Sequence, residues 1–148
     1  MAHYSVLADE NKDVFKKILS DKELDRIITV ELMGDSKLKE PGYKVSKAGD
    51  RVQFKLGVDV FIDVNEEIFD SLTPEQQTIL ADEAIASISV NMESGAVKIV
   101  KTDFSTHMLM LKKYSNETMV TFKESVKSLY DAMKDREEGG GAEVNNAE

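Results

Sequence analysis

The stretch DVFIDVNEEIFDSLTPEQQTILADEAIAS, residues 59–87, decides the fold of this 148-residue chain. Val60, Ile62 and Val64 recur at every second position, which predicts a β-strand, and the intervening Phe61 indicates that both faces of this strand are covered. Thr73 followed by a proline is typical of a helix start, because threonine caps the first turn and proline fits the first helical position. The stretch therefore predicts a central strand, a turn and a largely buried helix that ends near residue 92.

Shorter elements precede this stretch. Residues 10–20 space their apolar side chains as an amphipathic helix does. Residues 25–33 are rich in β-branched side chains and end at Gly34-Asp35-Ser36, which predicts a strand and a turn. Val52, Phe54 and Leu56 alternate with charged or polar residues and predict a further strand, bent at the glycine that follows.

The C-terminal third is mainly helical by its pattern. Residues 97–100 are too short to assign, whereas Thr102-Asp103 is expected to cap a helix and residues 116–134 to form a longer one. Residues 136–148 contain three consecutive glycines among acids and amides, which predicts a flexible tail. We therefore expect one α+β domain over residues 1–135, with a small sheet of about three strands packed against three to four helices.

Composition excludes several classes of protein. The chain is 41% hydrophobic and 32% charged, so it can bury one core and is not wholly disordered. It contains no cysteine, which excludes disulfide scaffolds, thiolate zinc sites and thiol nucleophiles. No apolar run approaches the roughly 20 residues of a membrane-spanning helix, and the first twenty residues lack an apolar signal core. A cytoplasmic protein is expected.

Charge is segregated along the chain, whose formal net charge is -9. Residues 36–57 form a basic island with six Lys or Arg and two acids, whereas residues 58–93 form an acidic block with nine acids and no Lys or Arg. Two interpretations stay open. The opposite charges meet across the folded surface, or they separate two binding faces.

Two segments carry a resemblance to a known family. DVFIDVNEEIFDSLTPEQQTILADEAIAS at 59–87 and VKIVKTDFSTHMLMLKKYS at 97–115, with weaker similarity at 42–49, resemble the zinc metallopeptidases encoded by bacteriophages and prophages. The resemblance covers about residues 25–115 and implies a zincin-like core arrangement. In that family the helix after the Leu-Thr/Ser-x-Glu-Gln motif carries His-Glu-x-x-His. The corresponding residues here are Asp82 to Ala86.

The physical basis of that motif is its spacing, since two imidazoles four residues apart on a helix can hold one zinc ion while the glutamate activates a zinc-bound water. Asp82 and Ala86 replace both histidines, and Glu83 keeps its place. The resemblance therefore implies a degenerate member with no metal and no cofactor. A residual site of Asp82, Asp103 and His107 is the alternative to a simpler interpretation, in which Asp103 caps its helix and His107 lies beside the core.

The first function that we expect is a non-catalytic, metallopeptidase-like phage protein that binds or regulates a host or phage macromolecule, such as a nucleic-acid enzyme. The acidic block would engage a basic site on that partner or imitate a phosphate backbone. A surviving metal-dependent hydrolase is the least favoured interpretation, and the sequence predicts no membrane partner and does not indicate the oligomeric state.

The alternative is an accessory protein of transcription or replication that binds single-stranded nucleic acid. Cations interleaved with aromatic rings supply phosphate contacts and stacking faces, although the negative net charge opposes binding to a polyanion. Tyr114 would add a further stacking ring to this surface. The candidate nucleic-acid-binding residues are Lys37, Lys39, Tyr43, Lys44, Lys47, Arg51, Phe54, Lys55, Lys98, Lys101, Lys112 and Lys113.

Overall fold

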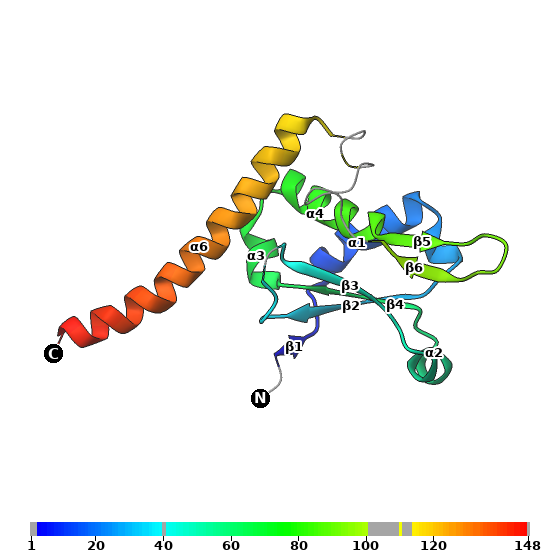
Figure 1. The fold of residues 1–148 in the computed structure, drawn as a ribbon, viewed down its shortest axis with the longest axis horizontal. Helices are drawn as coiled ribbons and strands as arrows, with labels where there is room; N and C mark the ends of the chain where they lie inside the picture. The colour runs from blue at the N-terminus through cyan, green and yellow to red at the C-terminus, as the bar shows by residue number, and fades with distance from the viewer. Residues whose placement is uncertain (1–2, 40, 101–109, 111–113, 148) are drawn as a thin grey trace.

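The structure, a computed structural model, describes residues 3–39, 41–100, 110 and 114–147. Within these ranges the fold is α+β, as the sequence predicts, with a four-stranded sheet and a separate two-stranded one in place of about three strands (Figure 1). The elements in chain order are β1 (Tyr4–Ser5), α1 (Asp9–Asp21), the 3-10 turn η1 (Leu24–Arg26), β2 (Val30–Asp35), β3 (Tyr43–Lys47), α2 (Asp50–Leu56), β4 (Val60–Val64), α3 (Glu66–Ser71), α4 (Pro74–Ala86), β5 (Ile88–Val90), β6 (Val97–Ile99) and α6 (Asn116–Ala147).

Strand β4 lies in the middle of the larger sheet, whose order is β1-β2-β4-β3. It runs parallel to β2 and antiparallel to β3. The side chains of Val60, Ile62 and Val64 are fully buried, and they join the hydrophobic core to which α1 and α4 contribute. Phe61 and Asp63 alternate with them, at intermediate and buried positions. The predicted central strand is confirmed.

Strand β2 lies further along the chain than predicted. The predicted strand at residues 25–33 begins with η1, and the expected turn at Gly34-Asp35 belongs to the strand itself. Gly34 pairs with Ser5 of β1, and a Cβ at Gly34 would lie only 2.4 Å from the Ser5 Oγ. The glycine therefore permits the close approach of the edge strand β1. In the sequence alone, a glycine kept for close packing looks the same as a glycine in a turn.

Helix α2 corrects the strand predicted from Val52, Phe54 and Leu56. Phe54 and Leu56 are 88% and 68% exposed, so their alternation does not reflect a buried sheet face. The helix ends at Gly57, whose φ of 69° is left-handed and whose N–H donates to the Gln53 carbonyl. Glycine adopts this conformation without the strain that a side chain would add.

Helix α4 begins as the sequence predicts and ends earlier. Thr73 and Gln76 form a capping box, with a 3.2 Å bond from the Gln76 N–H to the Thr73 Oγ1 and a 3.1 Å bond from the Thr73 N–H to the Gln76 Oε1. The residues from Ile79 to Ile85 are all buried, which confirms a largely buried helix. The helix stops at Ala86 because Ile88–Val90 pairs with Val97–Ile99 as β5 and β6.

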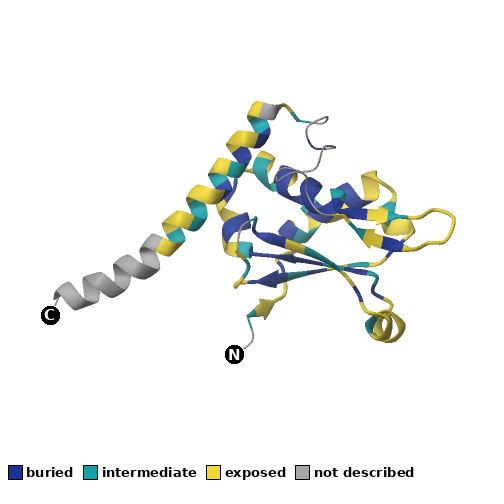
Figure 2. Ribbon diagram, in the orientation of Figure 1, coloured by how far each residue is buried: buried dark blue, intermediate teal, exposed yellow. Residues whose placement is uncertain are grey.

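Helix α6 packs beside α3, with Met119, Phe122 and Val126 buried along one stripe (Figure 2). It begins at the predicted residue and continues to Ala147, through the Gly-rich segment where the sequence predicts no regular structure. This last part of the helix leads away from the rest of the molecule (Figure 1). The flexibility of that segment and the domain boundary at residue 135 stay predictions. None of the helices in the described ranges is both long and apolar enough to span a bilayer.

Candidate functional site

The three motif positions of the family lie on the C-terminal half of α4, within the core layer. Asp82 is 1% exposed and Glu83 is fully buried, while Ala86 is at an intermediate position. A carboxylate removed from water must be paired and hydrogen-bonded, since burying an isolated charge is very costly. The partners of these two carboxylates therefore determine what the site can do.

Glu83 is held by two side chains from distant elements. Its Oε1 accepts a hydrogen bond of 2.5 Å from the Tyr43 hydroxyl on β3 and another of 2.5 Å from the Lys123 ammonium on α6. Burial and the neighbouring Glu83 charge raise the pKa of Tyr43 far above its usual value. This hydroxyl therefore stays protonated and donates a hydrogen bond to Glu83. Glu83 thus lies in a closed network of a carboxylate, a phenol and an ammonium.

Asp82 has its own cation and its own phenol. Its Oδ1 lies 3.3 Å from the Lys22 ammonium, which follows α1, and its Oδ2 accepts a 3.0 Å hydrogen bond from the Tyr114 hydroxyl. Burial, reinforced by this hydrogen bond and by the Asp82 charge, raises the pKa of Tyr114 to about 12. Both carboxylates at the motif positions are therefore neutralised from within the chain.

The residues described here do not fit the zinc ion that the resemblance would place on this helix. Zinc requires at least three protein ligands with free lone pairs at about 2 Å. Ammonium groups already bind Asp82 and Glu83, and Ala86 has no donor atom. The described ranges contain no cluster of three His, Asp or Glu side chains that could hold a metal ion. Asp103 and His107, the remaining candidates, lie outside those ranges.

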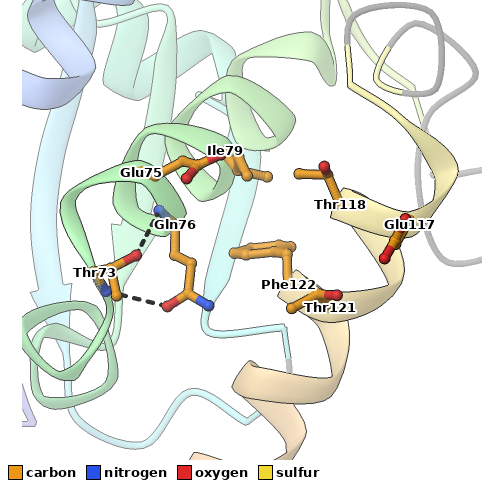
Figure 3. Close-up of a pocket in the computed structure, with 8 residues that line it drawn as sticks. All are labelled: Thr73, Glu75, Gln76, Ile79, Glu117, Thr118, Thr121 and Phe122. Atoms are coloured by element: carbon orange, nitrogen blue, oxygen red, sulfur yellow. Dashed lines mark hydrogen bonds between the residues drawn. The ribbon is translucent and has the colours of Figure 1, made fainter.

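A cavity of about 270 Å³ separates the start of α4 from α6 (Figure 3). Glu75 and Glu117 contribute carboxylates to its lining, and Phe122 contributes an apolar wall. The capping box of Thr73 and Gln76 forms part of its rim. Neither Asp82 nor Glu83 lines this cavity, so it gives no access to the motif positions.

The acidic block is not one continuous surface, which corrects part of the sequence interpretation. Three of its nine acids are buried within the fold, namely Asp63, Asp82 and Glu83. Glu66 and Asp70 accept hydrogen bonds from the buried Asn11 side chain of α1. The block is therefore partly internal. Lys22 and Lys123, which pair with Asp82 and Glu83, do not belong to the basic island, so both interpretations of the charge segregation stay predictions.

The basic island is divided between the two ends of β3. Lys37 and Lys39 precede the strand, and Arg51 and Lys55 follow it on α2. Tyr43 is buried against Glu83, so the predicted stacking role of this ring is wrong. Of the other candidates, Lys44 and Lys47 are exposed on β3, Phe54 on α2 and Lys98 on β6. Lys101, Lys112 and Lys113 lie outside the described residues.

The sequence interpretation missed the two lysines that neutralise the motif carboxylates. A signal for Lys123 exists, because it lies four residues after Met119 and three before Val126, within the apolar stripe of α6. A lysine in such a stripe indicates a buried acidic partner. Lys22 follows the last turn of α1 and has no comparable signal.

A second pair of buried carboxylates lies at β2 and β4. The Asp35 Oδ1 accepts the Lys37 backbone N–H at 3.0 Å and lies 2.6 Å from the His3 Nδ1. Burial opposes ionisation of Asp35, but these two partners prevail and lower its pKa. Asp63 is buried, and no described residue donates a hydrogen bond to its Oδ1. Burial and the Asp35 charge raise the pKa of Asp63.

Comparison with known proteins agrees with the resemblance of these segments. Neither a curated protein nor a solved structure matches the chain, so the zincin-like arrangement stays a prediction. A family model does match, over residues 4–134 and hence from β1 into α6. Because that match spans most of the sequence, the chain belongs to the family described as "Putative phage metallopeptidase".

Proposed function

We propose that this chain is a non-catalytic member of its family that acts by binding another macromolecule. One observation carries the proposal: the carboxylate at the glutamate position of the motif is fully buried and bound to the Lys123 ammonium and the Tyr43 hydroxyl. A general base must reach the water that it activates and must be free to accept its proton. Glu83 meets neither requirement in this arrangement.

The replacement of both histidines supports the same proposal. The Lys22 and Lys123 ammoniums supply the positive charge that a metal ion would otherwise supply beside Asp82 and Glu83. A buried carboxylate needs some cation, and here the cation belongs to the chain itself. The helix of the family motif is thereby kept as a core element while its chemistry is lost.

Zinc analysis and a peptidase assay test the absence of catalysis. Protein purified without chelators is expected to hold less than about one tenth of an equivalent of zinc, and peptide hydrolysis with or without added zinc is expected to equal that of a blank. Glu83→Gln serves as the control for contaminating proteases. Stoichiometric zinc together with hydrolysis that Glu83→Gln abolishes would overturn the proposal.

The binding surface that we propose is the acidic seam between α4 and α6, formed by Glu75, Glu117 and Glu124. Glu75 and Glu117 line the cavity of Figure 3, and Glu124 lines an adjoining groove. All three are exposed, in contrast to the buried acids of the block. Carboxylates along a hollowed seam favour a basic protein segment as the partner.

Affinity capture from host lysate, with and without nuclease, tests this binding role. We expect Glu75→Lys with Glu117→Lys to abolish capture of a basic protein. Glu10→Lys with Asp13→Lys, the same change of charge at exposed positions of α1, is expected to leave capture intact. Capture that disappears with nuclease, or that both double variants reduce equally, would contradict a protein-binding seam.

Helix α2 favours single-stranded nucleic acid as a second candidate function. Phe54 is 88% exposed, and Arg51 and Lys55 lie three residues before it and one after it. Arg51 lies on the same helix face as Phe54, and an open ring beside a cation can stack on a base while the cation contacts a phosphate. Binding of a fluorescent single-stranded oligonucleotide should then weaken about tenfold in Phe54→Ala, since a stacked base contributes about 1–3 kcal/mol. Leu56→Ala is the matched control, and an equal loss in both variants would exclude stacking at α2.

A further inference from the structure

A basic cleft lies where the connection between β2 and β3 faces α6. Its volume is about 830 Å³, which falls within the roughly 300–1,000 Å³ of small-molecule sites. Its lining includes Lys37 and Lys39 from the connection and Lys134 from α6. None of the described residues that line it belongs to the network around Asp82 and Glu83, so the cleft is separate from the motif positions.

The floor of the cleft is fixed by hydrogen bonds. The Leu38 carbonyl accepts 3.0 Å bonds from both the Asn65 Nδ2 and the Tyr130 hydroxyl. Asn65 is 2% exposed, and its Oδ1 also caps α3 by accepting the Ile68 N–H. The connection, α3 and α6 are therefore tied together at one carbonyl. Because the walls are already ordered, a ligand would bind with little loss of protein conformational freedom.

The charge of the cleft is opposite to that of the whole chain. Among the described residues, three ammoniums and the carboxylate of Asp131 line it, which gives these lining residues a charge of about +2 in a protein of net charge -9. Such a site favours an anion. A terminal phosphate carries about two negative charges at pH 7 and balances this excess, whereas one carboxylate balances half of it.

The remaining wall favours an organic part beside the phosphate. Tyr130, Met133 and Leu38 line the cleft at intermediate exposure, so a ring, a thioether and an aliphatic side chain face one ligand-sized space. Aromatic and thioether groups make good contacts with the flat face of a base. We propose that this cleft binds a phosphorylated nucleotide, either free or as the 5′-phosphorylated end of a single strand.

Calorimetric titration of the full chain at low salt tests the proposal. AMP is expected to bind saturably, while adenosine, which lacks the phosphate, and inorganic phosphate, which lacks the base, are expected to bind at least tenfold more weakly. Lys37→Glu with Lys134→Glu should weaken AMP binding at least tenfold. Lys16→Glu with Lys17→Glu, an identical change of charge on α1, should change it less than twofold.

Thermal unfolding of both double variants shows whether they are folded, and Lys37→Gln with Lys134→Gln replaces the charge reversal if that variant is unstable. Absence of saturable AMP binding would overturn the proposal, as would equal losses in the two double variants. Adenosine or inorganic phosphate bound as tightly as AMP would overturn the assignment of a nucleotide.

Two tetranucleotides that differ only in a 5′-phosphate distinguish the two sources of ligand. If the cleft receives a strand end, the 5′-phosphorylated form should bind more tightly than both AMP and the 5′-hydroxyl form, and Lys37→Glu with Lys134→Glu should remove that difference. If it receives a free nucleotide, the two tetranucleotides should bind equally and more weakly than AMP. Either result supports a nucleotide site once AMP binding is established.

Discussion

The pair of Glu83 and Lys123 is the contact on which the buried network depends most. Glu83 is fully buried and the Lys123 side chain is 26% exposed. Removal of one partner from a buried pair leaves an uncompensated charge, which costs about 3–5 kcal/mol. We expect Lys123→Met to lower the free energy of unfolding by about 3 kcal/mol, the lower end of that range, because the lysine is partly hydrated.

Urea unfolding and a double-mutant cycle measure this coupling. Adding Glu83→Gln to Lys123→Met should restore about 2 kcal/mol, since the orphaned charge is then gone. Lys127→Met changes an exposed lysine on the same helix and should have an effect below about 0.5 kcal/mol. If Lys123→Met is as stable as the parent protein, the two side chains are not coupled.

Asp35 and Asp63 should respond to the same substitution in opposite directions. The raised pKa of Asp63 means that its ionisation costs more in the folded state than in the unfolded state, so this cost is absent below the unfolded pKa and develops as pH rises through the folded pKa. The lowered pKa of Asp35 means that its stabilisation is present above the unfolded pKa and is lost as pH falls through the folded pKa.

At pH 7 we therefore expect Asp63→Asn to stabilise the protein by about 1 kcal/mol and Asp35→Asn to destabilise it by a similar amount. At about pH 3 both differences should shrink, because the carboxyl groups then approach their protonated forms. Urea unfolding at the two pH values measures this. Effects of the same sign at pH 7 would contradict the contrast between the unpaired Asp63 oxygen and the bonded Asp35.

At the level of elements, the capping box at the start of α4 is the clearest local signal in the chain. Thr73→Ala removes the acceptor for the Gln76 N–H and should cost about 1 kcal/mol. Thr78→Ala is the matched control on the same helix, because its exposed hydroxyl donates to the Pro74 carbonyl, which belongs to the helix itself. Chemical unfolding of both variants should show a loss for Thr73→Ala alone, and equal losses would contradict a capping role.

Elements were predictable where the pattern reflects burial. The period-two run from Val60 to Val64 and the cap at Thr73 both correspond to observed contacts with the core. The alternation at residues 52–56 does not correspond to contacts with the core. The side chains there belong to a helix without buried residues, which Gly57 ends. The end of α4 was missed because the apolar residues after Ala86 continue a helical pattern, while their strand partner lies about ten residues away.

At the level of the whole molecule, the sequence located the motif positions but not their partners. Lys22 and Lys123 are 60 and 40 residues away from the carboxylates that they neutralise. No local pattern gives such pairing, which arises when the core brings α1 and α6 to α4. The sequence therefore indicated what the site had lost and could not indicate what replaced it.

Deletion of residues 135–148 should leave the stability of the domain unchanged. The family match ends at residue 134, and α6 leads away from the rest of the molecule beyond that point (Figure 1). The free energy of unfolding should change by less than about 0.5 kcal/mol, as for a surface change. Urea unfolding of the shortened protein measures this, and a loss above about 1 kcal/mol would show that the segment belongs to the folded domain.

The pairing of β3 with β4 and of Glu83 with Lys123 has a consequence for folding during translation, because the second member of each pair is synthesised later. Within the described residues β3 pairs in the sheet with β4, which is synthesised after it, and Glu83 receives its ammonium 40 residues later still. A nascent chain that has emerged only as far as α4 therefore carries that carboxylate without its cation. Final closure of the core must await translation of α6, so a ribosome that pauses before codon 123 would hold an incompletely folded chain that is prone to aggregate.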